Sequence, residues 1–191
     1  MTEFDVLTLF RRSGALLEGH FRLSSGLHSP GYLQCALVLQ YPRHAEALGA
    51  ALAERVRSFG ATAILSPAMG GIVIGQEVAR GLGVRALFAE RQDGSLTLRR
   101  GFALSPEDRV LVVEDVVTTA GSTRETIAVA QHHGATVVGA CSIVDRSNGT
   151  HGLDVPYAAL LPMDLPTYQE SECPLCKQGI EIVKPGSRTP R

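Results

Sequence analysis

The stretch Val110-Leu-Val-Val-Glu114-Asp115-Val-Val-Thr118-Thr119-Ala120-Gly121-Ser122-Thr123 decides how this chain folds. Its first four residues are apolar and three of them are β-branched, which predicts a strand buried on both faces of a parallel sheet. Two adjacent carboxylates follow. Inside a regular strand they would point to opposite faces, and one would be buried without a partner. We therefore expect the strand to end near the acids, in a cleft.

The second half of this stretch favours a phosphate site. Small hydroxyl residues and a glycine lead into a helix predicted at residues 123–133 and closed by Gly134. Such a turn offers backbone N–H groups, hydroxyl donors and the positive end of a helix dipole. The alternative is an ordinary helix start capped by Ser122 or Thr123, which leaves the two acids unexplained.

Strands and helices alternate on both sides of this stretch. Helices are predicted at residues 42–59 and 72–82, and strands at residues 61–65, 84–88, 110–113 and 136–144. This alternation has the spacing of βαβ units and predicts an α/β fold with a mostly parallel central sheet flanked by helices. We expect a single domain over residues 1–191. It comprises an N-terminal helix and extended arm (1–40), an α/β core (42–165) and a low-order C-terminal tail (166–191).

Composition argues against several classes of protein. The net charge is −1, so no overall positive field favours nucleic acid or an anionic membrane. No apolar run approaches the ~18 residues of a membrane span, and the first residues lack the features of a signal peptide. A P-loop is excluded because the glycine-containing turn has no lysine. Gly81-Leu-Gly83 follows a helix and precedes a strand, so it reads as a helix stop rather than a dinucleotide fingerprint. We expect a cytoplasmic enzyme with no nucleic-acid and no membrane partner.

The four cysteines fall into two groups. Cys35 and Cys141 stand alone in apolar surroundings, which is typical of small buried side chains. Cys173-Pro-Leu-Cys176 has the spacing of zinc ligands but supplies only half of a tetrahedral site. Zinc would need a second pair of ligands, for example from another subunit. Two alternatives for Cys173 and Cys176 remain open: a disulfide between them and a pair of inert thiols.

Residues 110–123 resemble the 5-phosphoribosyl 1-diphosphate (PRPP) signature of the type I phosphoribosyltransferases. That signature is an apolar strand, two acids, two variable residues and then Thr-Thr-x-Gly-Ser/Thr. The resemblance implies the type I phosphoribosyltransferase fold, in which the acids hold the ribose hydroxyls and the loop holds the 5′-phosphate. Asp115 is then a catalytic residue. The implied PRPP-binding residues are Glu114, Asp115, Val116, Val117, Thr118, Thr119, Ala120, Gly121 and Ser122.

Three further stretches are similar to the orotate phosphoribosyltransferases, and the likeness runs over residues 4–165. Residues 20–33, His20-Phe-Arg-Leu-Ser-Ser-Gly-Leu-His28-Ser-Pro-Gly-Tyr-Leu, resemble the small N-terminal hood that covers the base. Ser66-Pro-Ala-Met69-Gly70-Gly-Ile72 resembles a loop that contacts pyrophosphate through backbone amides, which implies roles for Met69 and Gly70 in PRPP binding.

The third stretch is Val144-Asp145-Arg146, which resembles the strand end where the family's arginine meets the orotate carboxylate. The implied orotate-binding residues are Thr118 and Arg146. An arginine at a strand end can hold a carboxylate with a bidentate fork. The alternative for Arg146 is a surface ion pair with Asp145.

The chain departs from the commoner orotate pattern in two places. Ser24 stands where many members have a hood lysine, and whether it replaces that lysine stays open. The family's catalytic loop usually carries lysines and a histidine, whereas residues 90–100 offer Arg91, Arg99 and Arg100. We expect a mobile loop or hairpin whose arginines close over the pyrophosphate, with Arg91 first among them for both PRPP binding and catalysis. The alternative is a solvated β-hairpin whose arginines pair with Glu90 and Asp93.

The resemblance implies transfer of the phosphoribosyl group from PRPP to orotate, giving orotidine 5′-phosphate and diphosphate in pyrimidine (UMP) biosynthesis. Mg²⁺ is the implied cofactor, bound through PRPP rather than by direct protein ligands. A homodimer with shared active sites is the implied assembly. Two alternatives remain: a phosphoribosyltransferase for a purine base such as xanthine or adenine, and a non-enzymatic ligand-sensing regulator of the same fold.

Overall fold

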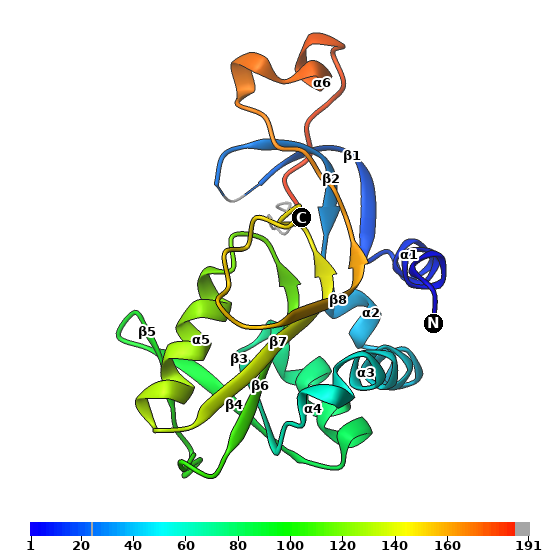
Figure 1. Cartoon of the computed structure of the whole chain (residues 1–191). Helices are drawn as coiled ribbons and strands as arrows, with labels where there is room; N and C mark the ends of the chain where they lie inside the picture. Colours follow the sequence, from blue (N-terminus) through cyan, green and yellow to red (C-terminus); the bar gives the residue numbers. More distant parts are fainter. Residues whose placement is uncertain (24, 186–191) are drawn as a thin grey trace.

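A six-stranded sheet forms the centre of the molecule in this computed structural model, which describes residues 1–23 and 25–185 (Figure 1). Its strand order is β5-β4-β3-β6-β7-β8, and every neighbouring pair is parallel except β4 with β5. The strands are β3 (Ala63–Pro67), β4 (Arg85–Gln92), β5 (Ser95–Leu98), β6 (Arg109–Val117), β7 (Thr136–Asp145) and β8 (Tyr157–Pro162). The mostly parallel α/β sheet that the sequence predicts is confirmed.

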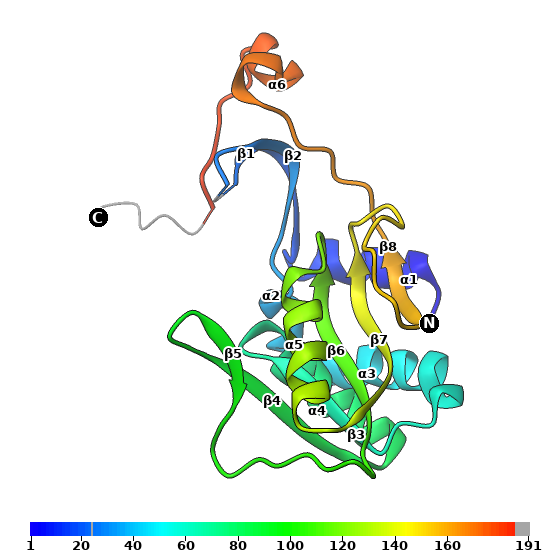
Figure 2. The same cartoon turned by 60° about the vertical axis from the view of Figure 1, so that its left-hand side comes forward.

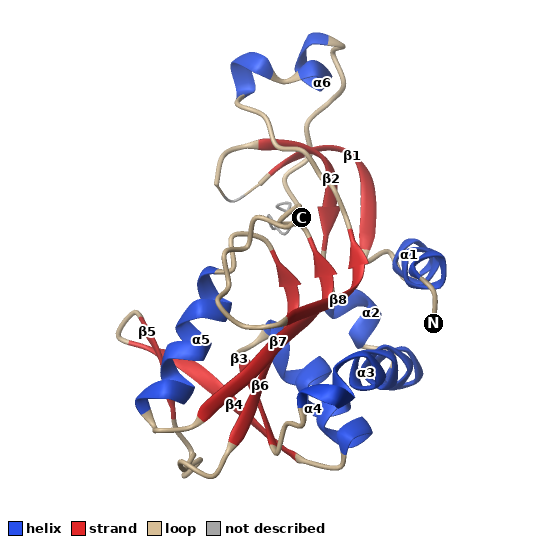
Figure 3. Cartoon of the chain, in the orientation of Figure 1, coloured by secondary structure: helices blue, strands red, loops and turns tan. Residues whose placement is uncertain are grey.

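Helices cover both faces of this sheet (Figures 1 and 3). Helices α3 (Pro42–Val56) and α4 (Gly70–Leu82) lie on one side, and α5 (Gly121–His132) lies on the other. Two short N-terminal helices, α1 (Glu3–Arg12) and α2 (Ala36–Leu39), pack into the same core as α3 and α4. No helix in the described ranges is long and apolar enough to span a membrane.

Strand β6 shows why its apolar run predicted a strand buried on both faces. Leu111 and Val113 pack in the core under α3 and α4, while Val110 and Val112 pack in the core under α5. Successive side chains of a strand point to opposite faces, so four consecutive apolar residues supply both layers.

Glycines set the helix ends and one close helix contact. Gly83 ends α4 with φ 73°, and its N–H donates to the carbonyl oxygens of Ala79 and Arg80. This left-handed cap confirms the helix stop that the sequence predicts. In α3, a Cβ on Gly49 would lie 2.3 Å from the Cβ of Glu77, so glycine is needed where α3 and α4 cross.

The hood residues fold into most of a two-stranded antiparallel hairpin that stands away from the main sheet (Figure 2). Its strands are β1 (Leu16–Arg22) and β2 (His28–Leu33), paired from Leu16 with Leu33 to Arg22 with His28. Ser24, the position of the family's hood lysine, lies outside the described residues.

The prediction of a low-order tail after residue 165 was wrong for much of this segment. Tyr168 exchanges two backbone hydrogen bonds with His28, both 2.9 Å long. Val183 accepts from the N–H of Arg22 and donates to the carbonyl of His20. The C-terminal segment therefore bridges each open edge of the β1–β2 hairpin at one position. Sequence periodicity does not reveal such long-range pairing. Between these contacts lie η2 (Glu170–Glu172) and α6 (Pro174–Lys177).

Residues 90–100 form the hairpin option of the loop prediction. Strand β4 continues to Gln92, which pairs with Ser95 at the start of β5. Asp93 and Gly94 connect the two strands with φ of 50° and 88°. Positive φ at both central residues is what a type I′ turn requires, and Asp-Gly is a preferred sequence for it.

Candidate active site

The signature stretch runs along the end of β6, through a short turn and into α5. Strand β6 extends to Val117, so both acids lie inside the strand rather than after it. The prediction of a strand ending at residue 113 was therefore wrong. Pairing of Glu114 with Ser142 and of Val117 with Asp145 on β7 keeps this segment extended.

Glu114 is a buried acid with an unsatisfied oxygen. Its side chain is 6% exposed, and Oε2 has no hydrogen-bond partner. Burial, and next the adjacent Asp115 carboxyl group, raise the pKa of Glu114 to about 9. Burial also raises the pKa of Asp115, although Asp115 Oδ1 accepts a 2.9 Å hydrogen bond from the N–H of Val116. Two desolvated carboxyl groups side by side destabilise a fold, and such pairs are typical of functional sites.

The start of α4 lies against Asp115 and the end of the β6 apolar run. A Cβ on Gly70 would lie 2.8 Å from Oδ1 of Asp115, and a Cβ on Gly71 would lie 2.8 Å from the carbonyl oxygen of Val113. Glycine at these two positions lets the backbone approach Asp115 and strand β6 closely. Met69, the residue before them, is 84% exposed. The predicted pyrophosphate loop and the predicted ribose acids are thus neighbours.

The turn into α5 leaves its first amide groups without a side-chain cap. Ala120 is the cap residue, in the left-handed conformation with φ 57°, and it makes no side-chain hydrogen bond. The alternative of a cap by Ser122 or Thr123 was therefore wrong: both lie inside the helix, and the buried Thr123 hydroxyl has no partner. Exposed Ser122 adds a hydroxyl beside these amides. A helix start of this kind is suited to a phosphate group.

A cleft of about 650 Å³ joins this turn to the hood. Thr118 and Thr119 of the signature line one part of it, and Leu23 and Leu27 from the tip between β1 and β2 line another. Arg146 also lines the cleft, just beyond the end of β7. The structure therefore brings Thr118 and Arg146, the two predicted orotate-binding residues, to one cavity beneath the hood.

Arg146 is held in place while part of its guanidinium group keeps free donor capacity. Its backbone N–H donates to Val117 across 2.8 Å, and Nη2 donates to the carbonyl of Leu165 across 3.2 Å. Nε is buried without a partner, and burial lowers the pKa of this half-buried side chain. Among the described residues Arg146 forms no ion pair with Asp145, so that alternative is wrong; Oδ1 of Asp145 accepts instead from the N–H and hydroxyl of Ser147. An arginine with an unsatisfied donor in a cleft is suited to a carboxylate ligand.

The three arginines of residues 90–100 lie outside the cleft of their own chain. Arg91 pairs with Glu125 on α5 at 3.0 Å, and Arg100 forms a two-pronged ion pair with Glu90, both contacts being 2.7 Å. The Arg100–Glu90 pair is the one that the alternative of a solvated hairpin predicts. The predicted pairing of an arginine with Asp93 is not found among the described residues. Neither arginine, nor the exposed Arg99, is among the residues that line the 650 Å³ cleft.

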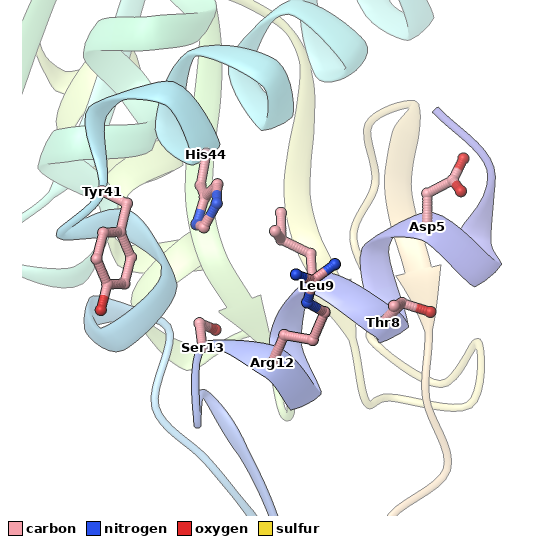
Figure 4. Close-up of a pocket in the computed structure, with 7 residues that line it drawn as sticks. All are labelled: Asp5, Thr8, Leu9, Arg12, Ser13, Tyr41 and His44. Carbon is pink, nitrogen blue, oxygen red and sulfur yellow. The ribbon is translucent and has the colours of Figure 1, made fainter.

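A second hollow of about 390 Å³ lies between α1 and the start of α3 (Figure 4). None of the predicted site residues lines it, and neither the acid pair nor the signature turn contributes to it. The lining residues are Asp5, Thr8, Leu9, Arg12, Ser13, Tyr41 and His44. Of the predicted site residues, Thr118, Thr119 and Arg146 line the larger cleft, whereas the acid pair is not among its lining residues.

Comparison with known proteins agrees with this geometry. A model of the phosphoribosyl transferase domain matches residues 37–158. The orotate phosphoribosyltransferase of Pelotomaculum thermopropionicum is 54% identical over 188 residues, covering 98% of this chain and 99% of the relative. That of Chlorobaculum parvum is 51% identical over 189 residues, covering 99% and 98%. The chain belongs to the orotate phosphoribosyltransferase family.

Solved structures extend the likeness to the fold. The orotate phosphoribosyltransferase of Aeropyrum pernix superposes with a TM-score of 0.67 at 25% identity, covering 83% of this chain and 93% of that one. The Mycobacterium tuberculosis enzyme in complex with PRPP gives 0.68 at 23% identity, covering 84% and 95%. An adenine phosphoribosyltransferase from Leishmania tarentolae gives 0.60 at 18%, covering 82% and 87%, so the fold is shared beyond orotate enzymes.

Two residues that line the cleft were not predicted from the sequence. Arg124 and His151 line the cleft, and Arg124 donates to the carbonyl oxygens of Thr119 and His151. Arg124 directly follows the signature, which is a signal that sequence reasoning could have used. His151 lies in the connection between β7 and β8, and no motif marks it.

Proposed function

We propose that this protein transfers the 5-phosphoribosyl group of PRPP to N1 of orotate, giving orotidine 5′-phosphate and diphosphate. This is a step of pyrimidine biosynthesis, and we expect the enzyme to act in the cytoplasm. The observation that carries the proposal is the shared cleft, in which the signature threonines, Arg146 and the hood tip face one cavity.

Arg146 supports orotate as the base because orotate carries a carboxylate. The buried Nε without a partner needs an acceptor, and a carboxylate bound by the guanidinium fork would supply one. Adenine and xanthine carry no carboxylate, so they offer the guanidinium group only neutral acceptors. Hydrogen bonds between charged groups are roughly twice as strong as neutral ones, so Arg146 favours orotate over these purines.

We assign the ribose to Glu114 and Asp115 and the 5′-phosphate to residues 118–122. The hydroxyl groups of the ribose are donors that suit the unsatisfied Oε2 of Glu114. The amides at the start of α5, with the hydroxyls of Thr118, Thr119 and Ser122, suit the phosphate monoester. Backbone amides at Met69 and Gly70 would hold the pyrophosphate beside the acid pair.

These residues also fit Mg²⁺ as the cofactor. Mg²⁺ prefers oxygen ligands and is commonly held through substrate phosphates with few protein ligands. Glu114 and Asp115 supply hard carboxylate oxygens beside the proposed ribose and pyrophosphate positions, and one of these oxygens lacks a partner. When bound through PRPP, the ion would neutralise charge on the leaving diphosphate.

The proposed reaction asks the protein for position and charge rather than covalent chemistry. The bond from C1′ to the diphosphate oxygen breaks, and its electron pair leaves with diphosphate. The bond from orotate N1 to C1′ forms, and the N1 proton is released. C1′ becomes cation-like as one bond breaks and the other forms. Most of the rate enhancement therefore comes from holding the two reactants in line and from stabilising the negative charge on the leaving diphosphate.

We propose that the loop arginines complete the site across a homodimer. Arg91, Arg99 and Arg100 lie on the β4–β5 hairpin, away from the cleft of their own chain. In a shared active site they would reach the pyrophosphate of the partner's cleft. Their ion pairs with Glu90 and Glu125 would then be exchanged for contacts with the leaving group.

The direct test is to incubate the protein with PRPP, Mg²⁺ and orotate and to follow the loss of orotate absorbance. We expect orotate to be consumed faster than adenine, guanine or xanthine at equal concentration, and only with Mg²⁺. Arg12→Ala is a matched control, because Arg12 lines the separate hollow of Figure 4 and should leave turnover unchanged. A faster reaction with a purine would show that the assignment of orotate as the base is wrong. No reaction with any base, together with RNA retained on a filter, would favour a regulator.

A further inference from the structure

Four side chains outside the cleft converge where the hood meets the C-terminal segment. His20 lies on β1, His28 begins β2, and Cys173 and Cys176 lie at the start and within α6. One ligand atom from each, a ring nitrogen or Sγ, lies within 4.8 Å of all the others. His20, His28 and Cys173 are almost fully buried, at 3%, 2% and 0% exposure. The second pair that the cysteines lacked in the sequence comes from histidines of the same chain.

We propose that these four residues bind one zinc ion as a closed structural His₂Cys₂ site. A tetrahedral set of two sulfur and two nitrogen ligands is the arrangement that selects zinc among common divalent ions. With four protein ligands, no coordination position remains for water or substrate. The proposed ion is therefore structural and separate from the Mg²⁺ that serves the transfer reaction.

The distances between ligand atoms support the tetrahedron. Zn–N bonds of about 2.0 Å and Zn–S bonds of about 2.3 Å place tetrahedral ligands about 3.3 Å apart for N···N and about 3.5 Å for N···S. His20 Nε2 lies 3.0 Å from His28 Nδ1 and 3.5 Å from Cys173 Sγ. Cys176 Sγ lies 3.7 Å from His20 Nε2 and 3.3 Å from His28 Nδ1. All four separations are within about 0.3 Å of the values for a bound ion.

The other ring nitrogen of His20 is held as a zinc ligand requires. His20 Nδ1 lies 2.8 Å from the carbonyl oxygen of Ile180. A carbonyl only accepts, so Nδ1 carries the proton and Nε2 presents its lone pair to the cluster. Metal-binding histidines typically donate their second N–H to such a partner, which fixes both tautomer and ring orientation. The carbonyl comes from the C-terminal segment, so the chain around the cysteines also orients the histidine.

Charge balance also favours zinc at this buried position. Binding would release one proton from each cysteine thiol, and the two thiolates would neutralise the dication, while both histidines stay neutral. The resulting centre carries no net charge, which limits the cost of burying it.

The ion would fix the hood over the proposed base site. A two-stranded hairpin is marginally stable alone, and here its edges are paired with the C-terminal segment at Tyr168 and Val183. His20 and His28 lie on either side of the tip whose Leu23 and Leu27 line the cleft. A zinc ion joining both strands to α6 would hold that tip in place.

The test measures metal directly and does not depend on orotate turnover. The full-length protein, reduced and freed of metal, is titrated with Co²⁺ and then with Zn²⁺. We expect about one Co²⁺ per chain, with intense visible bands of tetrahedral cobalt and a thiolate charge-transfer band, and displacement of the cobalt by about one Zn²⁺. Elemental analysis of the purified protein should also find zinc, and chelation should lower Tm.

Variants identify the ligands. Cys176→Ser should remove about half of the thiolate charge-transfer intensity, because one of two sulfur ligands is lost, and should weaken zinc binding at least about 100-fold. Cys35→Ala is the matched control: it removes a buried cysteine outside the cluster and should leave the cobalt spectrum unchanged. No cobalt bands in the parent protein, a Cys173–Cys176 disulfide under the same reducing conditions, or an unchanged spectrum in Cys176→Ser would overturn the proposal.

Discussion

Replacing Glu114 with glutamine should stabilise the folded protein at neutral pH while impairing PRPP use. Burial raises the pKa of Glu114 from an ordinary value of 4.5 to about 9. Between these values the folded state retains a proton that the unfolded state has released. The free energy of unfolding therefore falls as pH rises through this window, and it does so by at most about 1.4 kcal/mol per pH unit. Glutamine cannot ionise, so the variant avoids this loss.

The expected gain depends on pH, which separates it from a packing effect. At about pH 5 the wild-type penalty is at most about 1 kcal/mol, and at about pH 7.5 it is at most about 4 kcal/mol. Water penetration and the coupled Asp115 carboxyl reduce this difference, and we expect a gain of about 1–3 kcal/mol at the higher pH. Activity should fall at every pH, because glutamine cannot become the carboxylate that would accept from the ribose hydroxyls once PRPP and Mg²⁺ are bound.

This gain is measured by urea unfolding of wild type and variant at both pH values, monitored by circular dichroism. Glu46→Gln, which changes an exposed glutamate on α3, is the matched control and should change stability by less than about 0.5 kcal/mol at either pH. An equal effect of Glu114→Gln at the two pH values would refute the reasoning. It would mean that Glu114 releases its proton over the same pH range in the folded and unfolded states.

Three further changes test the proposed site. Asp115→Asn should lower kcat/KM for PRPP about 100-fold without unfolding the protein, and activity within about threefold of wild type would remove Asp115 from the site. Arg146→Ala should raise KM for orotate far more than KM for PRPP and should barely affect the poor substrate uracil, whereas equal losses for both bases would contradict carboxylate recognition. Arg91→Ala should lower kcat with little change in orotate binding, and trypsin should cut wild type near Arg91 less readily when PRPP and Mg²⁺ are bound. Cleavage unaffected by ligand, with normal turnover of the Arg91, Arg99 and Arg100 single variants, would defeat the loop proposal.

Much of the candidate site could be predicted because its chemistry lies on local motifs. The acid pair and the threonine turn occupy one continuous stretch, and Arg146 marks the end of the next strand. Parallel strands bring their carboxyl ends to one edge, so the order of elements alone placed these groups together. The loop arginines are different. Their number and charge could be read from the sequence, but their partners, Glu90 and Glu125, depend on how the β4–β5 hairpin packs on α5.

The sequence by itself determined the α/β architecture, the signature and the base, because each is marked by short motifs whose residues are continuous in the chain. Tertiary structure decided the state of Glu114, since burial and then the adjacent Asp115 carboxyl group raise its pKa. It also decided where the C-terminal segment lies, because this segment pairs with the edges of a hairpin more than 130 residues earlier in the chain. Cys173 and His20 lie 153 positions apart, yet their ligand atoms are 3.5 Å from each other. A periodic pattern reports a residue's own strand or helix, whereas such a contact depends on how the whole chain closes on itself.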